Sequence, residues 1–423
     1  MENITTNIDF DMTAHLMDLE PDVTPTSSTE SESRPFRLFD ARLISVFFDQ
    51  VHLWYPIFNR RIVEEQYLTL SSLESLSHST SSALCLLISA IGVLAINLSQ
   101  GSDDDPRDYA VHAFEMLHLV ISDNTLAGVQ CLILYSIYHQ LSFQPIQAYH
   151  YVMMASYKVQ NLYKQSHRQD VVSTELYRRS FYALFIMERE LLVQLRLTPS
   201  GISTLEEHVV LPSGTFEDGT TDGATVTYFL AEIAMQKMLE QTDQNLGTSA
   251  PVPESGIDFA TVVAKEIEFQ IVEWRNNLPP AIAFPDSGIC RNDLSSFLKL
   301  QYHCQTCGIH WHALHKAIAT KGHPTEIHSE GQKCILAYCS FIDAASDFFS
   351  KPVMMPHVSM ALAAVFTMSL ATACVRKEEI ARSIAQVEDT FVRAVKILRG
   401  YSAIYPAVGN WADVLRSRLD RGK

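Results

Sequence analysis

Glycine is scarce in this sequence, at 16 of 423 residues. Loops that cradle phosphates or dinucleotides need several glycines within a short stretch, and none of their fingerprints occurs here. The serine elbow of hydrolases and the paired histidines of zinc proteases are missing as well. Because no established catalytic motif is present, we expect a protein that is not an enzyme.

Basic charge is also scarce, since 32 Lys and Arg stand against 48 Asp and Glu, for a net charge of −16. The basic residues are scattered along the chain and form no stripe. Binding of nucleic acid depends on clustered Lys and Arg that displace counterions from the phosphates. We therefore expect that the chain by itself does not bind DNA specifically.

The sequence lacks the long apolar runs of membrane proteins. Its longest run, 84–98, is shorter than the roughly 20 residues that a membrane-spanning helix needs. The first ten residues have neither the basic nor the apolar part of a signal peptide. We therefore expect a soluble intracellular protein without a membrane partner, in which the eight cysteines are free thiols, most of them packed as small apolar groups.

The first 35 residues differ from the rest of the chain. Acidic residues dominate them, Arg34 is the only basic residue before position 35, and Ser, Thr and Pro are frequent. Such a composition predicts a disordered acidic tail, 1–35. Apolar and acidic residues alternate within it, which is typical of disordered activation segments, and the predicted anchors are Phe10, Leu16 and Leu19. The alternative is an acidic tail with a few stray apolar residues.

From residue 36 onward, helical periodicity dominates and the alternation of strands is absent. Asp40 is predicted to cap the first helix, which should end near Pro56. The further predicted helices are 82–99, 107–121, 125–142, 146–164, 173–196, 223–246, 257–277, 292–320, 328–350, 357–375, 378–400 and 407–419. We expect an all-α fold in which residues 36–423 form one large multi-helix domain.

One motif suggests an alternative, enzymatic function. Asp104, Asp105 and Asp108 match the Asp-Asp-x-x-Asp motif with which terpene cyclases, also all-α, hold magnesium and a diphosphate. The segment Asn292–Ser296 begins like the second metal motif of these enzymes, but Leu300 stands where a glutamate is required. The proline within the first motif favours a plain helix start with the preceding aspartate as cap. A terpene-cyclase-like enzyme remains the alternative hypothesis.

Six potential metal ligands lie close together between residues 303 and 315. They are His303, Cys304, Cys307, His310, His312 and His315. Metal sites use these residue types, but a single helix offers only two or three ligands from one face and cannot close a tetrahedron. No neighbouring loop supplies obvious further ligands, so we expect a packing helix without structural zinc.

Charged residues also cluster on the predicted helix 173–196. Arg178 and Arg179 lie on it together with the segment Glu188–Glu190. Residues three or four positions apart on a helix are neighbours and commonly form ion pairs on its surface. We therefore interpret these residues as surface pairs.

Several stretches, taken together, carry a family resemblance by their order and spacing. They are Phe39–Leu43 with Val51–Phe58, Thr125–Leu134, Ala148–Leu162, Glu175–Glu190 and Leu298–Ala317. They resemble the fungal-specific transcription factor domain, which is the regulatory domain of the fungal binuclear zinc-cluster transcription factors. Tyr182 stands where that family has tryptophan and Glu188 where it has aspartate, which indicates a divergent member.

The resemblance covers roughly residues 38–350 and implies a nuclear transcriptional regulator from a filamentous fungus. Such regulators often control a metabolic or secondary-metabolite biosynthetic gene cluster. The implied partners are the transcription machinery or a DNA-binding protein, a small effector, and a second subunit in a homo- or heterodimer; no cofactor is implied. Family members usually carry a six-cysteine zinc cluster that reads DNA. No cysteine precedes Cys85 here, so we expect that segment to be missing.

Overall fold

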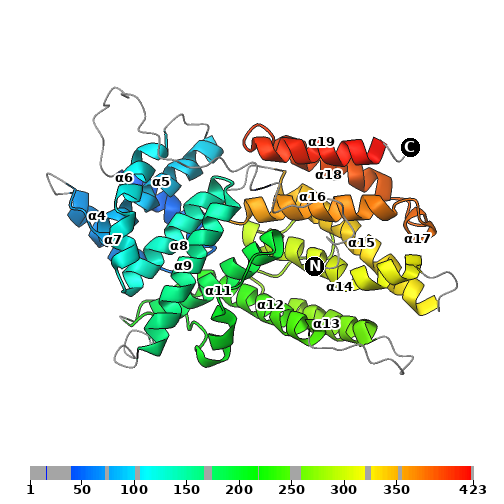
Figure 1. Ribbon diagram of the computed structural model, residues 1–423, viewed down its shortest axis with the longest axis horizontal. Helices are drawn as coiled ribbons and strands as arrows, with labels where there is room; N and C mark the ends of the chain where they lie inside the picture. Colours follow the sequence, from blue (N-terminus) through cyan, green and yellow to red (C-terminus); the bar gives the residue numbers. More distant parts are fainter. Residues whose placement is uncertain are drawn as a thin grey trace. The chain divides into compact units, whose positions relative to one another are not determined.

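The computed structural model describes residues 16, 40–71, 76–100, 105–165, 174–217, 219–247, 259–319, 325–350 and 355–420. Within these ranges the chain is helical almost throughout (Figure 1). The same ranges contain no strand, only an isolated antiparallel bridge between Thr215 and Thr221. The prediction of an all-α fold is confirmed.

The chain divides into two compact units. Of the described residues, unit 1 comprises those within Ala231–Lys351 and Ala361–Lys423, and unit 2 comprises those within Met12–Leu230 and Pro352–Met360. The prediction that residues 36–423 form a single domain stays a prediction.

Unit 2 is built around helix α8 (Leu126–Leu141), whose residues from Gly128 to Leu141 are all buried. Helices α9 (Pro145–Lys164) and α5 (Thr80–Gln100) pack against it. The remaining described helices of this unit are α3 (Ala41–Val46), η1 (Phe47–Val51), α4 (Arg60–Ser71), α6 (Arg107–Glu115), α7 (Leu117–Ser122), α11 (Glu175–Leu195), η3 (Ile202–His208) and the first part of α12 (Gly223–Gly247).

Unit 1 is organised around α14 (Asp293–Ala319) and α15 (Thr325–Phe348), which run alongside each other (Figure 1). Helix α13 (Phe259–Asn276) packs on α14, and α18 (Val387–Tyr401) packs on α15. The unit also contains the rest of α12 and of α16 (Val358–Val375), together with α17 (Glu379–Arg382) and α19 (Pro406–Asp420).

Local signals explain several helix boundaries. The Asp40 carboxylate accepts a hydrogen bond from the Arg42 amide at 2.9 Å, as predicted for the cap of the first helix. Two predicted helices are broken. Met116 (φ −92°, ψ 0°) separates α6 from α7, and Ser383–Gln386 separate α17 from α18. Helix α4 was not predicted, although Val63, Tyr67 and Leu70 are buried on one face at helical spacing.

Two helices, α5 and α16, are long and apolar enough to cross a membrane by length and composition alone. Their most apolar windows, Thr80–Asn97 and Val358–Val375, are 72% and 67% buried inside the structure. Burial of this extent is typical of core helices, which pass the same test of length and composition. The predicted apolar run 84–98 lies within α5 and is mostly buried.

Gly92 allows α5 to approach α3 closely. A Cβ atom at this position would lie 2.7 Å from the carbonyl oxygen of Leu43. Gly92→Ala is therefore expected to lower the free energy of unfolding by about 1–3 kcal/mol, because the backbones must separate. The control is Gly308→Ala in α14, where nothing lies within 4 Å of the new methyl group. There we expect a gain of about 0.5–1 kcal/mol from helix propensity. Urea unfolding measures both; equal effects would contradict the close-approach argument.

Candidate functional site

Helix α11 carries an unusual number of buried ionisable side chains. Glu175, Arg179, Glu188 and Glu190 are 2%, 0%, 3% and 6% exposed. The interpretation of Arg179, Glu188 and Glu190 as surface charges is therefore wrong. Spacing along a helix predicts which side chains can pair. It does not predict their burial, because the segments that cover this helix come from elsewhere in the sequence.

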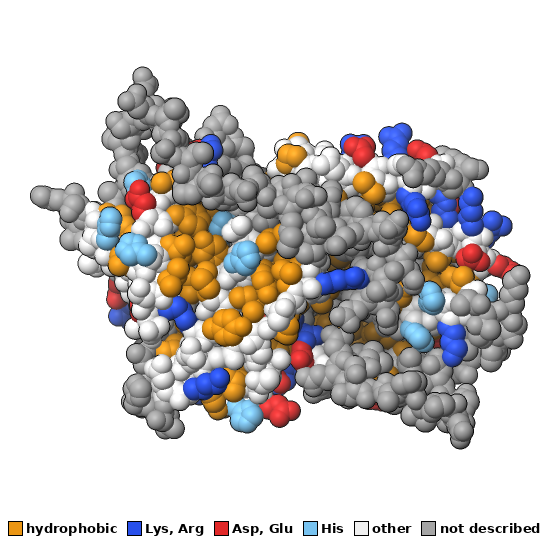
Figure 2. All heavy atoms as spheres, in the orientation of Figure 1, with side chains coloured by type: hydrophobic (Ala, Val, Ile, Leu, Met, Phe, Trp, Pro, Cys, Tyr) orange, Lys and Arg blue, Asp and Glu red, His pale blue; other side chains and the backbone are white. Residues whose placement is uncertain are grey.

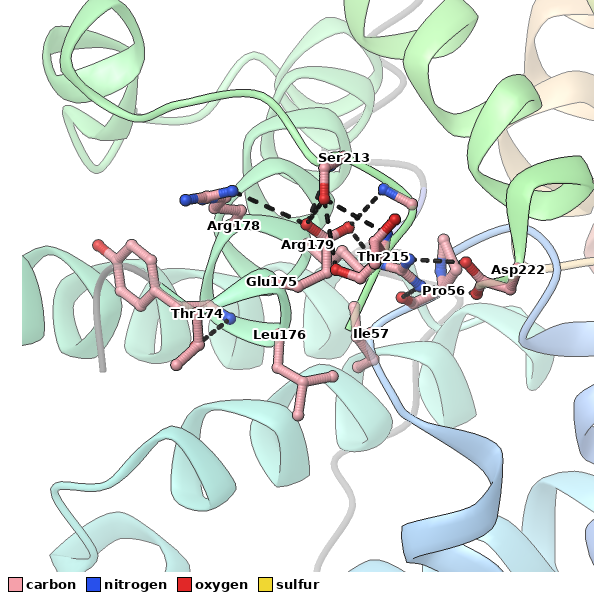
Figure 3. Close-up of polar contacts among 12 residues, drawn as sticks. Pro56, Ile57, Thr174, Glu175, Leu176, Arg178, Arg179, Ser213, Thr215 and Asp222 are labelled. Carbon is pink, nitrogen blue, oxygen red and sulfur yellow. Dashed lines mark hydrogen bonds and ion pairs between the residues drawn. The ribbon is translucent and has the colours of Figure 1, made fainter. Parts of the chain in front are cut away.

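Arg179 lies at the centre of a polar cluster, the Arg179 network, formed with Glu175, Asp222 and the Pro56 carbonyl (Figure 3). Its Nε donates to Glu175 Oε1 at 2.8 Å, and its two Nη atoms donate to the two oxygens of Asp222 at 2.7 Å each. Nη1 also donates to the Pro56 carbonyl at 3.2 Å, and the guanidinium lies 4.3 Å from the ring centroid of Phe216. The planar guanidinium of arginine suits this arrangement, because it can donate two parallel hydrogen bonds to one carboxylate.

Glu175 ties the loop before α12 to the start of α11 (Figure 3). Its Oε2 accepts hydrogen bonds from the amide and hydroxyl of Ser213, both at 2.9 Å, and its Oε1 accepts one from the Gly214 amide at 3.0 Å. The Glu175 amide in turn donates to the Glu217 carboxylate at 2.6 Å. The loop is thus fastened to α11 at several points.

The charges of the network stabilise one another. Burial by itself raises the pKa of Glu175, but the hydrogen bonds from Ser213, Gly214 and Arg179 outweigh burial and hold that pKa below its usual value. For Arg179, burial is likewise outweighed by the carboxylates of Asp222 and Glu175, which raise the pKa of the guanidinium. Both groups are therefore charged at neutral pH, as an ion pair within the core of unit 2.

Two further acids of α11 hold other segments of unit 2. Glu188 accepts hydrogen bonds from the amide and hydroxyl of Ser200, at 2.7 and 2.5 Å. Glu190 Oε2 accepts one from the Tyr55 hydroxyl at 2.8 Å and lies 3.1 Å from Nδ1 of His357. Each of these acids thus accepts hydrogen bonds from a segment outside the helix, and the acids of α11 fasten those segments to it.

The predicted diphosphate motif forms a helix start. Directly before α6, Asp105 accepts a hydrogen bond from the Arg107 amide at 2.9 Å. Its carboxylate also forms an ion pair with the Arg107 guanidinium. Asp104 lies outside the described residues. Asn292, which opens the second motif, accepts a hydrogen bond from the Ser295 amide at 2.8 Å and caps α14. Both motifs thus contain working helix caps.

The six His and Cys residues of α14 do not converge on one point. Cys304, Cys307 and His310 are buried, His303 is partly buried, and His312 and His315 are exposed. The Cys307 sulfur lies 3.7 Å from that of Cys334 on α15. Burial lowers the pKa of His310, against the opposing charges of Glu268 and Glu330. These acids come from α13 and α15 and were not predicted as neighbours, because each is far from His310 in sequence.

The predicted activation anchors are only partly described by the structure. Leu16 is helical and buried, at 1% exposed, whereas Phe10 and Leu19 lie outside the described residues. Their role in activation stays a prediction. On the face shown in Figure 2, the described Lys and Arg side chains are interspersed with acidic and apolar ones. That pattern agrees with the scattered basic residues of the sequence.

Comparison with known proteins places the Arg179 network in a recognised domain. Residues 44–232, which include Pro56, Glu175, Arg179 and Asp222, match the family model described as the Fungal specific transcription factor domain. The chain is also similar to the putative transcription factor ecdB of Aspergillus rugulosus, with 29% identity over 363 residues. This match covers 75% of the chain and 60% of that relative. No solved structure matches.

Proposed function

Residues 44–232 belong to the family of Fungal specific transcription factor domains, and from this premise we propose that the chain is a nuclear transcriptional regulator without catalytic activity. The family match is the observation that carries the proposal. The similarity to a putative transcription factor supports it, although the chain spans only 60% of the length of that relative. The acidic net charge of −16 supports action through protein partners rather than through direct contact with DNA phosphates.

In this proposal, the helical units bind partners or a small effector, and the acidic amino-terminal segment recruits the transcription machinery. Acidic residues keep the segment that carries the apolar anchors Phe10, Leu16 and Leu19 soluble, and Leu16, which is buried in the structure, is released when a partner binds. A separate DNA-binding protein would bring the chain, as a homo- or heterodimer, to its genes. These genes form a metabolic or secondary-metabolite cluster, as is common in the family.

The proposal is tested by tethering the full chain to an unrelated DNA-binding domain upstream of a reporter gene. We expect reporter expression to rise at least about tenfold over the DNA-binding domain alone, because recruitment of the transcription machinery no longer needs a separate DNA reader. A fusion in which Phe10, Leu16 and Leu19 are all replaced by alanine should lose most of the rise. The matched control replaces Thr24, Ser27 and Ser28 by alanine in the same segment.

A full-chain fusion that accumulates in the nucleus but neither raises nor lowers reporter expression would contradict the regulatory role. Equal activity of the two alanine fusions would contradict the role of the apolar anchors alone. Transcript profiling after deletion of the gene tests the finer proposal, since a regulator of a gene cluster should change the transcripts of neighbouring genes together.

A further inference from the structure

Three side chains that are distant in sequence meet in unit 1. Glu268 on α13, His310 on α14 and Glu330 on α15 each place one potential metal ligand within 4.8 Å of those of the other two. The side chains of His310 and Glu330 are 1% and 10% exposed, and that of Glu268 is 27% exposed. The cluster thus lies at the edge of the core, with its histidine inside and one carboxylate open toward water.

His310 lies between two acidic side chains. Its Nε2 lies 3.4 Å from Glu268 Oε1, and its Nδ1 lies 3.1 Å from Glu330 Oε2. Neither nitrogen makes a well-aligned hydrogen bond, although both are buried. Each ring nitrogen therefore has a carboxylate oxygen as a close polar neighbour. Two carboxylates this close to one another favour a cation beside them.

The distances suit a small transition-metal ion. Zinc binds histidine nitrogen and carboxylate oxygen at about 2.0–2.2 Å, so two ligands of a tetrahedral zinc lie about 3.4 Å apart. Zinc binds one nitrogen of a histidine ring, and Nε2 of His310 lies 3.4 Å from Glu268 Oε1, which is close to this value. With one ligand atom of Glu330, these residues offer three ligand atoms that lie within 4.8 Å of one another. Imidazole combined with carboxylates is also a ligand set that zinc accepts.

Lys333 supplies the positive charge in the present structure. Its Nζ lies 3.0 Å from Glu268 Oε2 and 3.2 Å from Glu330 Oε1. The lysine side chain is 41% exposed, so its flexible stem can carry the ammonium out into water. The two carboxylates and the ring are fixed on three packed helices and would remain.

We propose that Glu268, His310 and Glu330 form a zinc site, in which the metal takes the place of the Lys333 ammonium and a water molecule completes the coordination. Zinc then joins α13, α14 and α15, and the stability of unit 1 increases with zinc concentration. This inference is independent of the proposed role in transcription. It revises the expectation of no structural zinc on α14, which considered ligands only along that helix and in its neighbouring loops.

The experiment uses the full chain, stripped of metal with a chelator and titrated with zinc chloride by calorimetry. We expect one zinc per chain, confirmed by elemental analysis after dialysis, and a rise in melting temperature with zinc. Removing even an outer partner of a metal ligand typically lowers affinity about 10–100-fold, so Glu330→Gln should weaken binding at least tenfold. Lys333→Gln should instead strengthen binding, because the competing cation is gone.

His315→Gln is the matched control, since this exposed histidine lies on the same helix outside the cluster. It should bind zinc as the unaltered chain does. If Glu330→Gln does not fold, as judged by circular dichroism, Glu268→Gln at the more exposed ligand takes its place. Absence of stoichiometric zinc in both the unaltered chain and Lys333→Gln would overturn the proposal. Loss of binding in His315→Gln to the same extent as in the ligand variants would overturn it as well.

Discussion

Replacing Arg179 by leucine is expected to lower the free energy of unfolding of unit 2 by about 3–5 kcal/mol. The substitution removes the cation but leaves the buried carboxylate of Glu175 and the paired carboxylate of Asp222 without their counter-charge. It also removes the hydrogen bond to the Pro56 carbonyl and the contact with the Phe216 ring. An unpaired charge in a core costs far more than an ion pair on a surface.

The matched control is Arg178→Leu at the neighbouring position. Arg178 is 23% exposed, and its guanidinium lies 4.0 Å from Glu175, at the limit of an ion pair. We expect that control to change stability by less than about 1 kcal/mol. Chemical unfolding gives the free energies, and hydrogen exchange of the loop 211–222 reports whether it is released. Similar losses for the two variants would mean that Arg179 acts only as another surface charge, contrary to its burial.

Replacing Trp411 by alanine is expected to lower the free energy of unfolding of unit 1 by about 3–5 kcal/mol. Trp411 on α19 is fully buried and stacks on Phe366 of α16, with the ring centroids 5.5 Å apart and the planes inclined by 14°. Alanine removes the stacked ring and leaves a cavity that the surrounding helices fill only in part. Trp411→Phe should cost clearly less, because a ring remains to stack.

Val392→Ala on α18 provides the control within the same unit, since Val392 is 68% exposed. It should change stability by less than about 0.5 kcal/mol. Hydrogen exchange, followed by mass spectrometry of peptides from α16 and α19, assigns the effect of each variant to unit 1. A loss for Trp411→Ala no greater than for Val392→Ala would show that the ring is not part of the core.

Local signals in the sequence determined the helices. Apolar periodicity and cap residues act within a few positions along the chain, so Asp40 and Asn292 begin helices as their neighbours predict. Where the apolar pattern continued across a break, as at Met116, the prediction failed, and α4 was missed although its buried residues follow helical spacing. Those boundaries depend on packing against other helices as well as on local preference.

The sequence by itself determined the all-α class, the composition break near residue 35 and the order of motifs that resemble the fungal-specific transcription factor domain, whose family model matches residues 44–232. Only the tertiary structure decided which charges are buried. The spacing of Glu175 and Arg179 is the same for a surface pair and a core pair, and their burial depends on the distant loop that carries Asp222. In the same way, three packed helices bring Glu268 and Glu330 to His310. Side-chain periodicity specifies faces of a helix, whereas contacts between faces depend on how the whole chain packs.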